Sequence, residues 1–93
     1  MPQDYAEAAK WWRKAAGQGC PDAQYNLGVV YRASRGVPQD YVQAHMWFNL
    51  SAAHGDEVLA KDAAKARDNL AKLMTYGQIT EAQRLARAWK PNM

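Results

Sequence analysis

Cysteine, β-branched residues and long apolar runs are all scarce in this sequence of 93 residues. Cys20 is its single cysteine, which excludes an intramolecular disulfide and leaves the redox compartment undetermined. No apolar run approaches the roughly 18 residues that a membrane-spanning helix needs. The first residues carry neither the charged nor the apolar region of a secretory signal. Because the chain can be a fragment of a longer and exported protein, its localisation stays unknown.

Basic residues are spread along the chain rather than gathered into one patch. Twelve Lys and Arg against nine Asp and Glu give a net charge of +3, yet the longest basic run is Arg13-Lys14. A nucleic-acid-binding surface is normally a concentrated patch or stripe of basic residues. The charge pattern therefore favours a solvated surface and disfavours a nucleic-acid partner.

One short sequence occurs twice in the chain. Residues 2–5 read Pro-Gln-Asp-Tyr, and residues 38–41 read the same, 36 positions later. Further identities at this spacing pair Ala8 with Ala44, Trp11 with Trp47, Ala16 with Ala52, and Gly19 with Gly55. Self-similarity with a period of about 20 to 50 residues is the mark of a repeat architecture.

Start and stop signals divide the chain into five predicted helices. Alanine is common, and Gly and Pro fall in clusters, which is typical of helices joined by short turns. Asp4 and Asp40 can cap the first and third helices, and Thr75 has capping-box spacing to Gln78 at the fifth. The helices are expected over about 4–18, 21–32, 40–54, 56–74 and 75–90, with a loop at 33–38.

The apolar residues predict which faces are buried. Gly28 lies inside the second helix, where glycine costs about 1 kcal/mol relative to alanine, so a neighbouring helix backbone is expected to approach there. The fourth helix has a narrow seam at Leu59, Ala63, Ala66, Leu70 and Leu73. Core packing is the better interpretation of the aromatic residues at the repeat positions, Trp11 included, although a stacking surface is the alternative.

A longer pattern runs through the two units: Ala-Gln-Tyr-Asn-Leu-Gly-x-x-Tyr at 23–31, Gly-Val-Pro-Gln-Asp-Tyr at 36–41, then Ala44, Trp47-Phe48 and Ala-Ala-x-Gly at 52–55. This pattern closely resembles the Sel1-like repeat family, whose helix pairs are similar to tetratricopeptide repeats. The resemblance covers about 2–58. It implies an all-α solenoid of antiparallel helix pairs that acts as a protein-binding scaffold and has no catalytic centre or cofactor of its own.

The resemblance and the repeat suggest a division of the chain. We expect residues 1–93 to form a single domain with a first unit at 1–36 and a second, drifted unit at 37–74. Residues 75–93 would then form a C-terminal capping helix, because terminal units of repeat proteins commonly depart from their repeat.

No constellation for catalysis or metal binding is evident. His45 and His54 lie nine residues apart on one predicted helix, whereas a shared metal needs a spacing of about three or four. The sequence has no CxxC, no glycine-rich phosphate loop after a strand, and no Ser/His/Asp order of note. We therefore expect neither an enzyme nor a metal site.

Two kinds of contact surface remain as hypotheses. By resemblance to such solenoids, the helices with the Leu-Gly-x-x-Tyr pattern line the concave side and bind a protein or peptide partner. The candidate residues for that surface are Gln24, Tyr25, Asn26, Val29, Lys61, Asp62 and Lys65. Alternatively, the chain is the C-terminal end of a longer array that self-associates through its first helix, because Tyr5, Trp11 and Trp12 give this helix apolar residues on more than one side.

Overall fold

The computed structural model describes residues 4–35 and 39–92. Five helices occur in them, and no strand: α1 (Tyr5–Gly17), α2 (Pro21–Ala33), α3 (Tyr41–His54), α4 (Glu57–Ala71) and α5 (Tyr76–Ala88). The prediction of an all-α solenoid is confirmed. Two predicted features lie partly outside the described residues: the first copy of the repeat, whose Pro2 and Gln3 are not described, and the predicted loop, whose residues 36–38 include the second Pro.

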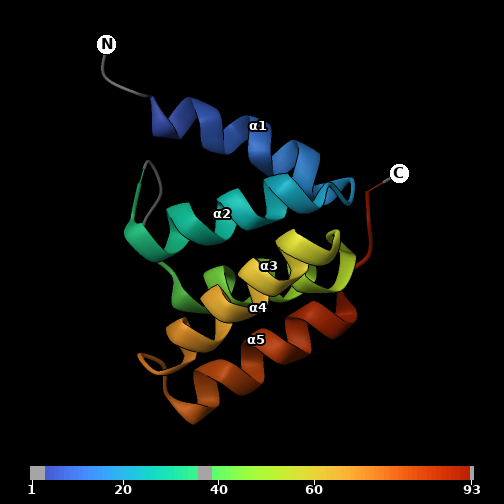
Figure 1. The fold of residues 1–93 in the computed structure, drawn as a ribbon. Coiled ribbons are helices and arrows are strands. Elements are labelled where there is room, and N and C mark those ends of the chain that lie inside the picture. The colour runs from blue at the N-terminus through green and yellow to red at the C-terminus, as the bar shows by residue number, and fades with distance from the viewer. Residues whose placement is uncertain (1–3, 36–38, 93) are drawn as a thin grey trace.

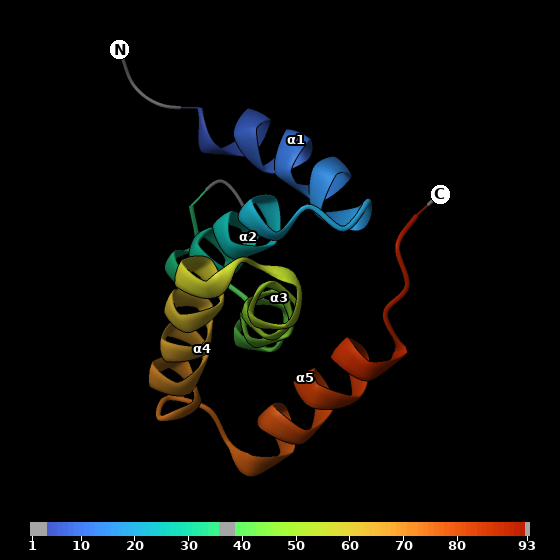
Figure 2. The ribbon, with the colours of Figure 1, turned by 45° about the vertical axis from the view of Figure 1, so that its right-hand side comes forward.

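The helices are stacked so that α3 occupies the centre. The helix α2 packs between α1 and α3, and α3 also packs against α4 and α5. Figure 2 shows α2 and α4 on one side of the molecule, with α1, α3 and α5 on the other. Consecutive helices run in opposite directions, so α2 and α4 point the same way (Figure 1). None of the helices in the described ranges is long and apolar enough to cross a membrane.

Side-chain caps explain where the helices begin. The carboxylates of Asp4, Asp40 and Asp56 accept hydrogen bonds from the backbone N–H three residues on, at 3.0, 3.0 and 2.9 Å. Thr75 and Gln78 form the predicted capping box at the start of α5. Between α1 and α2 the chain turns at Gly19, whose φ of 98° is the left-handed conformation that glycine tolerates.

The core lies on both sides of the α2–α3 interface. One cluster joins α1, α2, α3 and α5; its buried members are Ala16, Ala23, Leu27, Val30, Met46, Trp47 and Leu50. The other joins α3 to α4 through Ala44, Phe48 and Leu70, with Tyr25 and Tyr41 packed against it. Burying each large aliphatic or aromatic side chain contributes about 1.5 to 3 kcal/mol, so these two clusters hold the stack together.

Gly28 is required by an aromatic ring rather than by a helix backbone. A Cβ atom at this position would lie 2.5 Å from both Cδ1 and Cε1 of Phe48. Such a distance is far inside van der Waals contact, so only glycine allows α2 to approach α3 this closely. The predicted close approach exists, but its partner is the Phe48 side chain.

The C-terminal segment 89–92 leads from α5 back towards α1. The Trp89 ring lies edge-on to Trp47 at 6.4 Å and against His54 at 5.8 Å. Further along, the backbone N–H of Asn92 donates to the carbonyl of Gly17, at 2.6 Å. The two ends of the stack are therefore linked across the α3 layer (Figure 2).

Two residues predicted to be buried are exposed. Trp11 is 64% exposed although its repeat counterpart Trp47 is only 8% exposed. Trp47 is covered by Trp89, and no described residue gives Trp11 a ring contact of that kind. Leu73 is 57% exposed because α4 ends at Ala71, earlier than predicted, and Leu73 follows in the turn. The first correction thus depends on which element packs on the helix, and the second on where the helix ends.

We predict that Gly28→Ala destabilises the protein by about 1 to 3 kcal/mol, because the added methyl overlaps the Phe48 ring and overpacking costs that much. Urea unfolding followed by circular dichroism measures the change. Gly77→Ala is the matched control, since the atom nearest to its added Cβ is 4.0 Å away; it should stabilise by up to about 1 kcal/mol. Equal stabilisation by both substitutions would contradict the tight contact.

Candidate functional site

A groove runs between α2 and α4, with α3 at its base. Its volume is about 560 Å³. The ten lining residues come from these helices and the turns that follow α2 and α4: Tyr25, Val29, Arg32, Ala33, Arg35, Tyr41, Phe48, Ala66, Asn69 and Leu73. A groove of this size can take a few side chains of another molecule, because ligand sites in proteins commonly enclose about 300 to 1,000 Å³.

Helical spacing explains why these residues share one surface. Val29 follows Tyr25 by four positions on α2, and Arg32 and Ala33 come one turn later. Residues three or four positions apart lie on the same face of a helix. Ala66 and Asn69 on α4 have the same spacing, and they face α2 across the groove.

The groove surface is mainly apolar. Val29 is 38% exposed and Leu73 57% exposed, while Phe48 is buried at the base. The Tyr25 and Phe48 rings are tilted against each other with centroids 5.4 Å apart, which fixes the floor. Exposed apolar side chains beside a firm aromatic floor are what a partner can cover without rearranging the fold.

The only charges in the groove lining are two arginines near the end of α2. The Arg35 guanidinium donates to the Tyr5 hydroxyl at 2.8 Å and stands 5.2 Å from that ring's centroid. The Arg32 guanidinium has no ion pair or hydrogen bond within residues 4–35 and 39–92, although its backbone carbonyl accepts from Gln39 at 3.0 Å. This end of the groove is therefore positively charged.

The residues predicted for a partner surface do not all reach this groove. Tyr25 and Val29 line it. Gln24 does not, because it is completely buried and its amide donates to the carbonyl of Ala16 at 3.2 Å; its assignment to a contact surface is corrected. Asn26 is half-buried outside the lining.

The predicted residues of α4 also lie elsewhere. Lys61, Asp62 and Lys65 are exposed but are not among the lining residues, and Lys61 pairs with Glu57 at 3.6 Å. Sequence reasoning missed Asn69 and assigned Leu73 to the buried seam. Their spacing of three and seven positions from Ala66 is the signal that could have found them.

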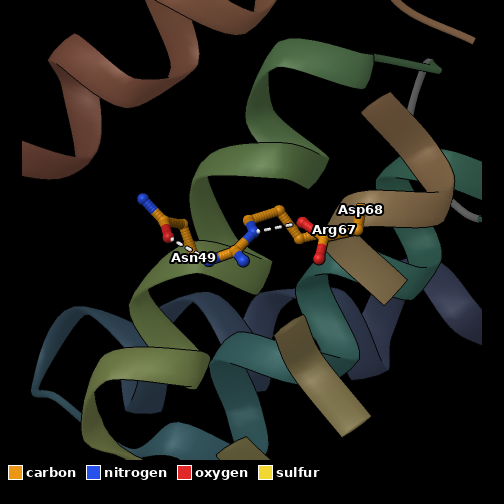
Figure 3. A network of polar contacts seen from close by, with 3 residues as sticks. All are labelled: Asn49, Arg67 and Asp68. Atoms are coloured by element: carbon orange, nitrogen blue, oxygen red, sulfur yellow. Dashed lines mark hydrogen bonds and ion pairs between the residues drawn. The ribbon is translucent and has the colours of Figure 1, made fainter. Parts of the chain in front are cut away.

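A polar network links α3 and α4 on another side of α4. Arg67 donates to the Asn49 side chain at 2.8 Å and to the Asp68 carboxylate at 3.0 Å (Figure 3). The guanidinium thus reaches from α4 to α3 while its neighbour on α4 balances its charge. With its partners satisfied, the arrangement is a structural connection between the two helices.

His45 lies one turn before Asn49 on α3 and is buried, with its Nδ1 atom lacking a hydrogen-bond partner. Burial lowers the pKa of His45, and the nearby Arg67 charge lowers it further, while Asp68 acts in the opposite direction. Folding therefore favours the neutral form of this imidazole.

A second, smaller depression lies on α1. It has a volume of about 230 Å³ and is lined by Asp4, Tyr5, Ala8 and Trp12. Two of the three residues predicted for self-association, Tyr5 and Trp12, therefore line one hollow. The third, Trp11, is strongly exposed on the same helix but lies outside the lining.

No metal-binding group emerges from the described residues, which contain no cluster of three or more His, Cys, Asp or Glu side chains. His45 is buried and His54 stacks on Trp89, so the two histidines do not share a site. Cys20 is exposed at the start of α2.

Stacked antiparallel helix pairs with a groove between alternate helices define the class of helical-repeat solenoids. The family model described as Sel1 repeat matches residues 1–20 and 21–56, which is more than half of the chain. The chain belongs to the Sel1 repeat family. Sel1 repeat proteins are generally non-catalytic scaffolds for protein–protein interaction.

The chain is also similar to a solved structure, that of a protective antigen present in uropathogenic Escherichia coli strains that displays an SLR fold. The two are 34% identical with a TM-score of 0.85. The match covers 96% of this chain and 18% of that one, so this chain spans less than a fifth of the antigen's length.

We predict that the free energy of unfolding falls as the pH drops below about 6.5, the ordinary pKa of histidine. The unfolded chain then takes up a proton on His45 that the folded state resists, so protonation favours unfolding. Urea unfolding between pH 7 and pH 5.5 should reveal the decline. It should disappear in His45→Gln and persist in His54→Gln; an unchanged slope in His45→Gln would contradict the assignment.

Proposed function

We propose that this chain is a non-catalytic scaffold that holds a segment of a partner protein in the groove between α2 and α4. The observation that carries the proposal is the groove itself, with Val29 and Leu73 exposed above a floor of aromatic rings. Covering apolar side chains contributes about 25 cal/mol for each Å² removed from water. A partner segment that covers Val29 and Leu73 is therefore stabilised in the groove without disturbing the core.

Family membership supports the same function in general terms. Sel1 repeat proteins work through protein–protein interaction, and stacked helical repeats commonly bind on the surface between alternate helices. Two of the buried polar side chains join helices: Ser51 donates to the carbonyl of Pro21 at 2.9 Å, and Gln24 donates to that of Ala16. These bonds hold the stack on which the groove is formed.

The test begins with short peptides selected by display against the purified chain. We predict that Leu73→Asp weakens their binding about tenfold or more, because a charge in an apolar contact is poorly solvated. Titration calorimetry measures the affinity. Since Leu73 is exposed, the substitution should change the free energy of unfolding by only about 0.5 kcal/mol.

Val58→Asp is the matched control for this experiment. Val58 is near the start of α4, is 71% exposed and lies outside the groove lining. It should leave the affinity unchanged. Equal affinities for the two variants, or peptide-induced chemical shifts that avoid Tyr25, Val29 and Leu73, would show that the groove is not the binding surface.

A second candidate function is assembly through α1. It is favoured by the exposure of Trp11 beside the depression lined by Tyr5 and Trp12, because a large exposed aromatic residue next to a hollow is typical of interaction surfaces. The occupant would be another copy of the chain or a further helix of a longer array.

We predict that the chain self-associates as its concentration rises and that Trp11→Glu abolishes this, because the charge would be buried in the contact. Sedimentation velocity over a range of concentrations measures the association. Tyr76→Glu is the control, since Tyr76 is an aromatic residue 85% exposed on α5. A monomeric chain at every concentration, or equal dissociation by both variants, would refute self-association through α1.

A further inference from the structure

The geometry points to a specific occupant of the groove: an acidic peptide segment that carries carboxylate side chains next to a bulky apolar side chain. The inference rests on the proposed function and adds the chemistry of the partner. Two observations support this partner chemistry: the charged and apolar side chains that line the groove, and the positions of this chain's own carboxylates outside it.

The lining carries positive charge that is not neutralised within it. Arg32 and Arg35 are the only charged side chains among the ten lining residues, none of which is Asp or Glu. An acidic segment would meet an opposite potential here, and a basic segment a like one. Charge complementarity of this kind governs which partners are accepted and how fast they associate.

The neighbouring carboxylates are engaged elsewhere or lie outside the groove. On α4, Asp68 pairs with Arg67 at 3.0 Å, and Asp62 is not in the lining. On the α3 side, Asp40 accepts the N–H of Gln43 as a helix cap. On α2, Asp22 is in the first turn, at the end opposite the arginines. No internal acid in the described ranges therefore occupies the arginines in advance.

The two arginines differ in how they are held. Arg35 is positioned by the Tyr5 hydroxyl and ring, and since a guanidinium has five N–H donors, this bond leaves others free for a carboxylate. Arg32 is exposed and has no polar partner for its guanidinium among the described residues. Arg35 is therefore held towards α1 and adds positive charge at this end of the groove, while Arg32 is the guanidinium that can adjust to a bound carboxylate.

Apolar and charged groups lie at the same end of the groove. Arg32 and Ala33 are in the last turn of α2, Tyr41 begins α3, and Leu73 follows the end of α4. Because α2 and α4 run in the same direction, their ends come to the same side of the molecule (Figure 1). The occupant must therefore present a carboxylate and an apolar side chain close together, rather than a long acidic tract or a purely apolar one.

The test uses four short fluorescent peptides of equal length and the intact chain. The first alternates Glu with Leu and Phe; the second replaces Glu by Gln; the third replaces Glu by Lys; the fourth keeps Glu and replaces Leu and Phe by Ser. Fluorescence anisotropy gives the affinities, and amide chemical shifts locate the bound peptide. The first peptide should bind in the groove at least about fivefold more tightly than each of the others, and more weakly as salt is raised.

Substitution of one arginine separates charge recognition from groove binding. Arg32→Glu should weaken binding of the Glu peptide about fivefold or more and strengthen binding of the Lys peptide. The affinity of the Gln peptide should change little. Arg87→Glu, an equal charge change at an exposed position of α5 outside the groove, should leave all four affinities nearly unchanged. Because Arg32 also complements the dipole of α2, an unfolding curve of each variant confirms that the fold persists.

The possible failures are distinguishable. If the Gln peptide binds the groove as tightly as the Glu peptide and Arg32→Glu changes neither, the acidic preference is overturned while the groove remains the binding surface. If the Glu peptide shifts no resonance of Tyr25, Val29 or Leu73, the inference is also overturned. In that case the display-selected peptides and Leu73→Asp decide the proposed function independently.

Discussion

The contact between Gly28 and the Phe48 ring is the constraint on which the rest of the structure depends. It allows α2 to lie directly on α3, where the Tyr25 and Phe48 rings pack at 5.4 Å. Phe48 also packs with Leu70 of α4, so one side chain of α3 joins both flanking helices. The separation of α2 and α4, and with it the groove and its aromatic floor, follows from this one ring.

The repeated sequence does not produce two equivalent surroundings. Trp47 is covered by Trp89 from the C-terminal segment, while its counterpart Trp11 stays exposed. The stack consequently has two open surfaces of different chemistry. The α2–α4 groove combines aromatic rings with arginines, and the α1 surface presents tryptophan beside a small hollow. The proposed partner segment is assigned to the first surface and the proposed assembly to the second.

Much of the fold could be predicted because the signals for it are local. The caps at Asp4 and Asp40 and the capping box at Thr75 involve residues within a few positions of one another. The candidate site was predicted only in part. Tyr25 and Val29 were found through the family resemblance, but Arg32, Arg35 and Asn69 belong to it through contacts between helices distant in the chain.

The sequence by itself determined the helices, their starts and the repeat that reveals the family. Capping hydrogen bonds join residues within one turn, and the 36-residue period is visible in the order of the residues alone. Only the tertiary structure decided exposure. Gln24 is buried against α1, Leu73 opens into the groove, Arg35 reaches Tyr5, and Asn92 returns to Gly17. Each of these depends on which element packs against the residue, and helical periodicity specifies a face without specifying its neighbour.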